Sequence, residues 1–298
     1  MRIFLEFLSL PDADREGSWL FQEDEMQKGR LNGVYNTYYP FGIFTKYKNA
    51  PEFEFDPVSI LYGGNGSGKS TILNIIAEKL KLDRRSPFEQ TDFFEDYCNL
   101  CELISESIPM TSKIITSDDI FKKLSDVRRI NRFNDGKRRE TWDRKSEMLY
   151  EIGNDPSLLR LDGLDDYARF AEYVDAARKS TSQFINDRIR NNLKAHSNGE
   201  TALGYLTGEI AENALYLLDE PENSLAPASQ LKLKQFIEES ARLFGCQFII
   251  STHSPLLLSI EGAKIYDLDD ECRLKKWFEL ENTKVYAEFF LQHKDRFE

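Results

Sequence analysis

The feature that most constrains this chain is a glycine-rich segment between two apolar stretches. Residues 63–70 have the sequence GGNGSGKS, which fits the pattern G-x-x-x-x-G-K-[ST]. A β-branched and aromatic run, 58–62, precedes it, and a run with apolar residues at helical spacing follows it. Strand, glycine turn and helix in this order form the phosphate-binding unit of α/β folds. The segment therefore predicts a buried strand, a phosphate-binding turn and a helix.

Each residue type in this segment has a physical role. Glycines let backbone N–H groups converge on phosphate oxygens, and the start of the helix adds partial positive charge. Lys69 is predicted to reach the β- and γ-phosphates, Ser70 to bind Mg²⁺ and Thr71 to add a phosphate contact. The predicted binding residues are Gly63, Gly64, Asn65, Gly66, Ser67, Gly68, Lys69, Ser70 and Thr71.

Two later runs are continuously apolar, as in parallel strands that are covered on both faces. Residues 214–218 lead into Asp219 and Glu220, and residues 247–252 lead into His253. Ligands of open α/β sheets bind at the carboxyl ends of the strands. We therefore expect Asp219 to hold Mg²⁺ through water and Glu220 to accept a proton from an attacking water. His253 is expected to contact the γ-phosphate or that water.

The remaining sequence suggests how the chain is organised. Residues 1–9 predict a strand, 11–28 an irregular acidic stretch and 34–56 short antiparallel strands rich in aromatic residues. Residues 83–195 are charged and mostly helical by pattern, with one helix expected over 92–106. Within them, Lys122–Lys145 holds ten basic and four acidic residues. This segment is either a solvated helical face or a surface for nucleic acid or an acidic partner.

Composition limits the class of protein. The chain has 298 residues with a net charge of −12, which argues against a surface that is basic overall. No apolar run approaches the length of a membrane span, so we expect no membrane insertion. Only four cysteines occur, which fits a reducing compartment. We expect a cytoplasmic location.

Four motifs in order resemble those of the ABC ATPase family, including its SMC-like branch. Residues 63–71 resemble its Walker A motif, 215–220 its Walker B motif with the catalytic glutamate, and 251–253 its histidine switch. Residues 197–200, SNGE, are similar to its signature motif. The chain is also similar to small bacterial ATPases that share the phrases GNGSGKST, LLDEPENSL and STHSPLLL.

The resemblance implies a fold and a domain plan. It implies an α/β fold of the ABC-ATPase P-loop type, with a mostly parallel central sheet flanked by helices, an N-terminal antiparallel β subdomain and a helical insert lobe. Residues 1–298 would form a single domain. Residues 1–82 and 196–298 would be its nucleotide-binding core, and 83–195 its helical insert.

The resemblance also implies a mechanism. ATP and Mg²⁺ would bind, with Ser70 and Asp219 at the metal. Lys69, Glu220 and His253 would be catalytic. Two copies would close head to tail on ATP, so that Ser197, Gly199 and Glu200 of one copy contact the nucleotide of the other. This homodimer would drive or gate a protein partner, such as an effector in antiviral defence or DNA maintenance.

The sequence departs from the family pattern at several positions. Asn198 stands where the signature has glycine, and residues 222–225 only approximate the family's D-loop. Gln90 is the candidate for its Q-loop glutamine, and the aromatic residue that stacks on adenine is expected between Tyr35 and Tyr47.

Two other functions remain open at this stage. One is the nucleotide-binding subunit of a membrane transporter, although the large charged insert is unlike such subunits. The other is an ATP-sensing scaffold without turnover, which the presence of Glu220 and His253 disfavours. No N-K-x-D motif for guanine recognition occurs, which disfavours a GTPase.

Overall fold

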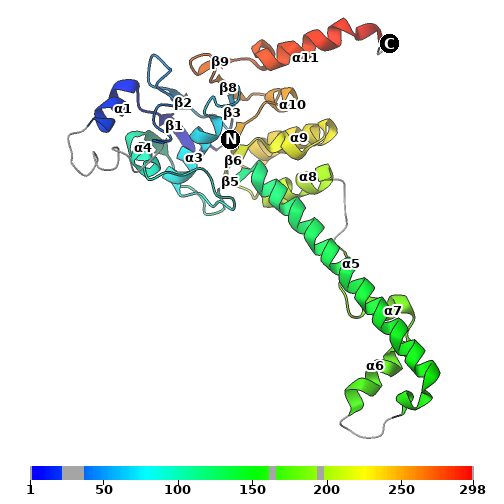
Figure 1. The fold of residues 1–298 in the computed structure, drawn as a ribbon. Helices are drawn as coiled ribbons and strands as arrows, with labels where there is room; N and C mark the ends of the chain where they lie inside the picture. Colours follow the sequence, from blue (N-terminus) through cyan, green and yellow to red (C-terminus); the bar gives the residue numbers. More distant parts are fainter. Residues whose placement is uncertain (1, 22–36, 161–165, 193–197, 297–298) are drawn as a thin grey trace. The chain divides into compact units, whose positions relative to one another are not determined.

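The computed structural model describes residues 2–21, 37–160, 166–192 and 198–296 (Figure 1). The chain divides into two compact units. Met1–Phe121 and Asn198–Glu298 form the first, here called the core unit, and Lys122–Ser197 form the second, the helical unit. Among the residues given above, no helix is both long and apolar enough to cross a membrane.

The core unit is built on a six-stranded sheet. Its order is β5 (Lys113–Thr116), β6 (Leu215–Asp219), β7 (Gln247–Ser251), β3 (Val58–Tyr62), β8 (Lys264–Asp267) and β9 (Arg273–Lys275). The first five strands run parallel, and β9 pairs antiparallel with β8. Every residue of β3 and β7 is buried, which explains why their mostly apolar sequences do not alternate with exposed polar residues.

A second sheet in the core unit is antiparallel. Its order is β2 (Glu52–Glu54), β1 (Leu5–Ser9) and β4 (Glu102–Ser105). The buried side chain of Gln247, the first residue of β7, joins the two sheets. Its Oε1 accepts hydrogen bonds from the N–H groups of Phe4 (2.8 Å) and Leu5 (2.9 Å), and its Nε2 donates to the Leu5 carbonyl at 2.8 Å. One amide side chain thus satisfies three backbone groups of Phe4 and Leu5, at the start of the first strand.

Helices complete the core unit. They are α1 (Ala13–Leu20), α3 (Lys69–Leu80), α4 (Phe94–Leu100), α8 (Asn198–Glu209), α9 (Pro227–Leu243), α10 (Pro255–Leu258) and α11 (Glu281–Gln292), with 3₁₀ turns η3 (Pro221–Ser224), η4 (Trp277–Glu279) and η5 (Lys294–Arg296). Helix α3 is buried along most of its length, including Ile72, Leu73, Ile75 and Ile76. This burial fixes the start of the helix, and with it the glycine turn, against the sheet.

The helical unit begins inside a long helix, α5 (Ser117–Asn154). It also contains η1 (Pro156–Leu159), α6 (Tyr167–Arg178) and α7 (Thr181–Asn186). Met148, Ala176 and Phe184 form a small apolar core. The buried ammonium of Lys145 donates to the Lys179 carbonyl at 2.7 Å, so this cation is used within the unit.

The predicted fold class is confirmed: a mostly parallel sheet with flanking helices and an N-terminal antiparallel sheet. Three local predictions were wrong. Residues 13–20 are helical rather than irregular, because Asp12 caps the helix by accepting from the Arg15 N–H at 2.7 Å. Among the described residues of 34–56, only 52–54 form a strand. The helix expected over 92–106 ends at Leu100, and β4 follows it.

The segment 83–195 also differs from expectation in part. Residues 83–121 group with the core unit, because β4 pairs with β1 and β5 pairs with β6. The compact helical unit therefore starts at Lys122. Sequence pattern did not reveal β4 and β5, because each strand has only four residues and lies beside helical sequence.

Candidate active site

The glycine turn connects β3 to α3 at the carboxyl edge of the parallel sheet. Gly66 and Gly68 have φ angles of 77° and 104°, a region that side chains disfavour. A Cβ atom on Gly68 would lie 2.6 Å from Cε1 of Phe44. Glycine is therefore required at position 68 by both backbone conformation and space.

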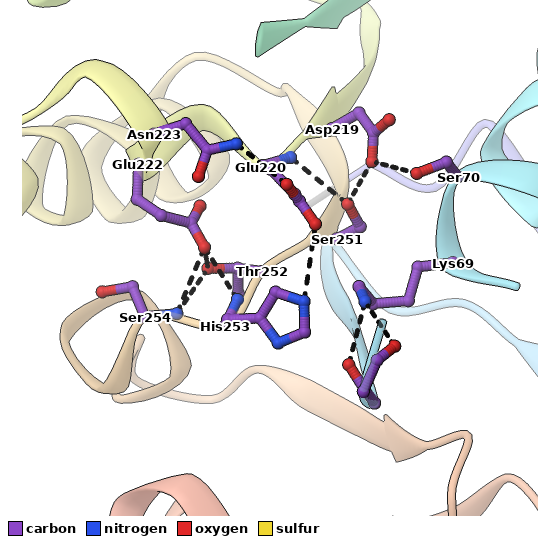
Figure 2. Close-up of polar contacts among 12 residues, drawn as sticks. Lys69, Ser70, Asp219, Glu220, Glu222, Asn223, Ser251, Thr252, His253 and Ser254 are labelled. Carbon is purple, nitrogen blue, oxygen red and sulfur yellow. Dashed lines mark hydrogen bonds and ion pairs between the residues drawn. The ribbon is translucent and has the colours of Figure 1, made fainter. Parts of the chain in front are cut away.

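Lys69 is buried in this turn, with 4% of its surface exposed. Its ammonium donates hydrogen bonds to the carbonyls of Gly63 (2.8 Å) and Gly64 (3.1 Å) (Figure 2). Burial lowers the pKa of Lys69, and the carboxylates of Glu220 and Asp219 oppose that change. The turn thus holds a cation where phosphate oxygens would approach.

Ser70 and Asp219 meet beside the turn. The Ser70 hydroxyl donates to Oδ1 of Asp219 at 3.0 Å, and the Ser251 hydroxyl donates to the same oxygen (Figure 2). Burial raises the pKa of Asp219, whereas these two hydrogen bonds lower it. A hydroxyl and a carboxylate are ligands that Mg²⁺ prefers, and Mg²⁺ usually takes its other ligands from water and phosphates. The pair therefore fits this metal.

Glu220 and His253 face each other across neighbouring strand ends. Oε1 of Glu220 lies 3.4 Å from Nε2 of His253, and Oε2 accepts from the Asn223 amide at 2.8 Å (Figure 2). Nε2 of His253 is buried and has no hydrogen-bond partner in the described part of the chain. Glu220 has φ 47°, and its N–H donates to the Ser251 carbonyl at 3.0 Å. The Glu220 carboxylate can thus accept a hydrogen bond from a water, and Nε2 of His253 can bind a water or, when it carries a proton, donate to a phosphate oxygen.

Glu222 was not predicted as a site residue. Its buried Oε1 accepts from the Thr252 hydroxyl (2.7 Å) and from the N–H groups of His253 (2.7 Å) and Ser254 (3.2 Å) (Figure 2). Burial raises the pKa of this carboxyl group. Glu222 therefore holds the turn that carries His253. The only sequence signal was a second carboxylate two residues after Glu220, with hydroxyl residues on both sides of His253.

Residues 38–47 lie against the glycine turn. The Tyr39 hydroxyl donates to the Thr71 hydroxyl at 3.1 Å, and the Lys46 ammonium donates to the Ser67 carbonyl at 3.3 Å. A pocket of ≈ 280 Å³ is lined by Tyr39, Ile43, Asn65, Gly66, Gly68, Lys69, Ser70, Thr71 and Glu220. Tyr39 is thus the aromatic residue of the 35–47 range that lines the pocket. Tyr35 lies outside the described residues.

Two of the predicted signature residues, Gly199 and Glu200, do not line this pocket. Ser197 lies outside the described residues, and Gly199 and Glu200 occupy the first turn of α8. A Cβ atom on Gly199 would meet Ser229 Oγ at 3.6 Å, an ordinary contact. Gln90 is exposed and lines a separate hollow. The sheet edge therefore gathers Lys69, Ser70, Asp219, Glu220 and His253 but neither Gly199 nor Glu200.

The basic segment Lys122–Lys145 lies in the helical unit, where several of its cations have partners. Arg129 pairs with Asp126, Lys137 with Glu140 and Arg144 with Glu172. The segment's positive charge is therefore partly balanced inside the unit. Its exposed cations include Lys122, Lys123, Arg132 and Arg139.

One family model matches residues 58–259, well over half of the chain. The model describes an AAA domain, putative AbiEii toxin, Type IV TA system. This chain belongs to that AAA-domain family. The AAA-domain match begins at the first residue of β3 and ends one residue beyond α10. It includes the glycine turn, both carboxylates and His253, but neither residues 38–47 nor α11.

Solved structures with a similar fold have low sequence identity. A dimeric ATP-binding cassette in a post-hydrolysis state with ADP and Pi is 16% identical (TM-score 0.36), covering 77% of this chain and 90% of its own. The SMC head domain from Thermotoga maritima is 15% identical (0.38; 90% and 94%). The Smc head domain bound to the C-terminal domain of ScpA, from Pyrococcus furiosus, is 14% identical (0.41; 96% and 99%). No curated protein matches this AAA-domain chain.

Proposed function

We propose that this chain binds ATP with Mg²⁺ and hydrolyses ATP to ADP and phosphate. The observation that carries the proposal is the gathering of Lys69, the Ser70–Asp219 pair and the Glu220–His253 pair at one edge of the sheet. These groups supply phosphate binding, metal ligands and a proton acceptor, which are the parts that phosphoryl transfer to water needs.

The residues suggest a division of labour. Lys69 would exchange its two carbonyl partners for β- and γ-phosphate oxygens and stabilise the charge that develops on them. Glu220, oriented by Asn223, would accept one proton from the water that attacks the γ-phosphorus. His253 would hydrogen-bond the γ-phosphate or that water through Nε2. Mg²⁺ held by Ser70 and Asp219 would neutralise phosphate charge.

We also propose that ATP brings two copies together head to tail. Gly199 and Glu200 do not line the pocket of their own chain, which supports a role opposite the nucleotide of a second copy. Ser197 would join them from the same segment. The γ-phosphate would then bridge the copies, and its hydrolysis would release the bridge. The closing dimer would act as a motor or switch for a protein partner, such as an effector in antiviral defence or DNA maintenance.

The proposed activity is tested by Glu220→Gln. We expect phosphate release to fall by about 10³-fold, since the general base is lost, while ATP still binds. Glu212→Gln, a change at an exposed glutamate, is the matched control and should behave as wild type. Unchanged phosphate release by Glu220→Gln would refute the mechanism. ATP binding without release by the wild type would indicate a sensing scaffold.

A further inference from the structure

Helix α11 carries an apolar face that the rest of the described chain does not cover. Val285, Tyr286, Phe289 and Phe290 each leave more than half of their surface exposed. Their spacing of one, three and four residues places them on one side of the helix. Here they are called the α11 face. Soluble surfaces rarely expose contiguous apolar patches of this kind without a binding role.

The beginning of α11, in contrast, is fixed to the core unit. Leu280 and Thr283 are buried, and the Asn282 N–H donates to the Tyr62 hydroxyl at 3.1 Å. Tyr62 is the last residue of β3, directly before the glycine turn. From Lys284 to Gln292, every residue is exposed. A helix of 12 residues is marginal in water unless its apolar face is packed, so this length of helix calls for a covering surface.

The size of the surface fits a protein interface. η4 adds two large exposed side chains, Trp277 and Phe278, whose ring centroids lie 6.0 Å apart. With about 150–250 Å² per aromatic side chain and roughly half of each exposed, the five aromatic residues of α11 and η4 offer on the order of 400–600 Å². A standard interface buries about 800 Å² on each partner. These aromatic residues alone therefore supply half or more of what each partner of a standard interface buries.

Charges at the two ends of α11 are of opposite sign. Glu279, Glu281 and Lys284 lie at its start with a net charge of −1, and Lys294, Asp295 and Arg296 follow its end with a net charge of +1. An antiparallel copy of the same helix would place the acidic start of one beside the basic end of the other. The two helix dipoles would then also be antiparallel, which places opposite partial charges side by side. The α11 face is thus complementary to itself under a two-fold axis.

We propose that α11 pairs in antiparallel fashion with α11 of a second copy and forms a dimer that needs no nucleotide. Only the effect of this dimer on closure with ATP rests on the proposed ATPase function. In two copies tethered through α11, the sheet edges that carry Lys69 and Glu220 would meet at a high effective concentration, so that closure on ATP would be intramolecular. The pairing itself is independent of hydrolysis and can be measured without ATP.

The decisive variant is Phe289→Glu with Phe290→Glu, which places charge in the centre of the α11 face. We expect the wild type without nucleotide to be a dimer at micromolar concentration by sedimentation or light scattering, and the variant to be a monomer. Leu243→Glu with Phe244→Glu is the matched control, since these adjacent apolar residues are also exposed, at the end of α9. The control should remain a dimer, and circular dichroism should show all three proteins folded.

A charge exchange tests the orientation of the two helices. Glu281→Lys alone should weaken the dimer a few-fold, and adding Lys294→Glu should restore it, because antiparallel helices bring these positions together. A wild type that is monomeric without ATP, or a dimer that survives the Phe289/Phe290 change, would overturn the proposal. That result would leave the Glu220→Gln test unaffected, so failure of the dimer and failure of the ATPase are distinguishable.

Discussion

The sheet edge that carries Lys69, Asp219 and Glu222, here called the nucleotide edge, and the start of α11 both lie at the end of β3. Their side chains differ in burial and in hydrogen bonding. At the edge, Lys69 and Glu222 are buried and Asp219 is half-buried, and their charged groups accept or donate several hydrogen bonds within the chain. On α11, large apolar groups are exposed, among them Phe289 and Phe290, whose ring centroids lie 5.6 Å apart. The first region is organised before any ligand arrives, whereas the second is completed only by association.

This difference predicts where substitutions act. Changes at the nucleotide edge should affect chemistry and the stability of a single chain, because buried polar groups lose partners there. Changes on α11 should affect association. Three experiments at the edge sharpen the comparison.

The largest effect is expected from Glu222→Ala. This change removes the acceptor for Thr252, His253 and Ser254, so kcat should fall by about 10–100-fold, or roughly 1.4–2.8 kcal/mol. KM for ATP should change much less, because Lys69 and the glycine turn are untouched. Glu222→Gln keeps an accepting oxygen and should restore most of kcat. Steady-state kinetics with Glu212→Ala as the control measures both constants. An unchanged kcat would show that Glu222 only supports the fold.

Next in size is Gly68→Ala. Its left-handed backbone and the contact of the new Cβ with Phe44 should lower the free energy of unfolding by about 1–3 kcal/mol. Gly204→Ala in α8 is the control. Nothing lies within 4 Å of its Cβ position, so alanine should be neutral or stabilise the helix by up to about 1 kcal/mol. Urea unfolding compares the two. Equal effects would contradict the tight packing of the turn.

The smallest effect is a pH dependence. Burial raises the pKa of Glu222 above its ordinary value of 4.5, so the folded state keeps this proton to higher pH than the unfolded state does. Relative to Glu222→Gln, the wild type should therefore lose stability as pH rises above 4.5 and through the raised pKa. Thermal unfolding of both proteins between acid and neutral pH measures the difference. The Tm of the wild type minus that of the variant should therefore fall as pH rises. A value that stays flat or rises with pH would contradict burial as the cause of the raised pKa.

Sequence alone predicted the elements whose signals are local. Val58–Tyr62 has the predicted bounds, because a buried strand shows its apolar pattern over neighbouring residues. The glycine turn was predicted because glycine, lysine and serine at this spacing are the residue types that a phosphate-binding turn needs. Helix α1 was not predicted, because its composition gives no clear helical pattern and its start depends on one capping residue, Asp12.

The parts of the site that sequence did not reveal depend on distant contacts. Glu222 binds residues about 30 positions later, and Tyr39 reaches Thr71 across 32 positions. No spacing rule indicates such pairs before the sheet brings the strand ends together. The roles of Lys69, Glu220 and His253 remain predictions, although the structure places their side chains at one edge.

Gln247 gives the strand β7 a mechanical property. The amino end of β7 holds the first strand of the antiparallel sheet through this amide, and its carboxyl end leads into His253. Its five residues span about 17 Å between these two contacts. Because β7 also pairs with β3 and β6, a displacement of the turn that carries His253 along the strand axis would be shared by these neighbours and by the backbone that Gln247 holds.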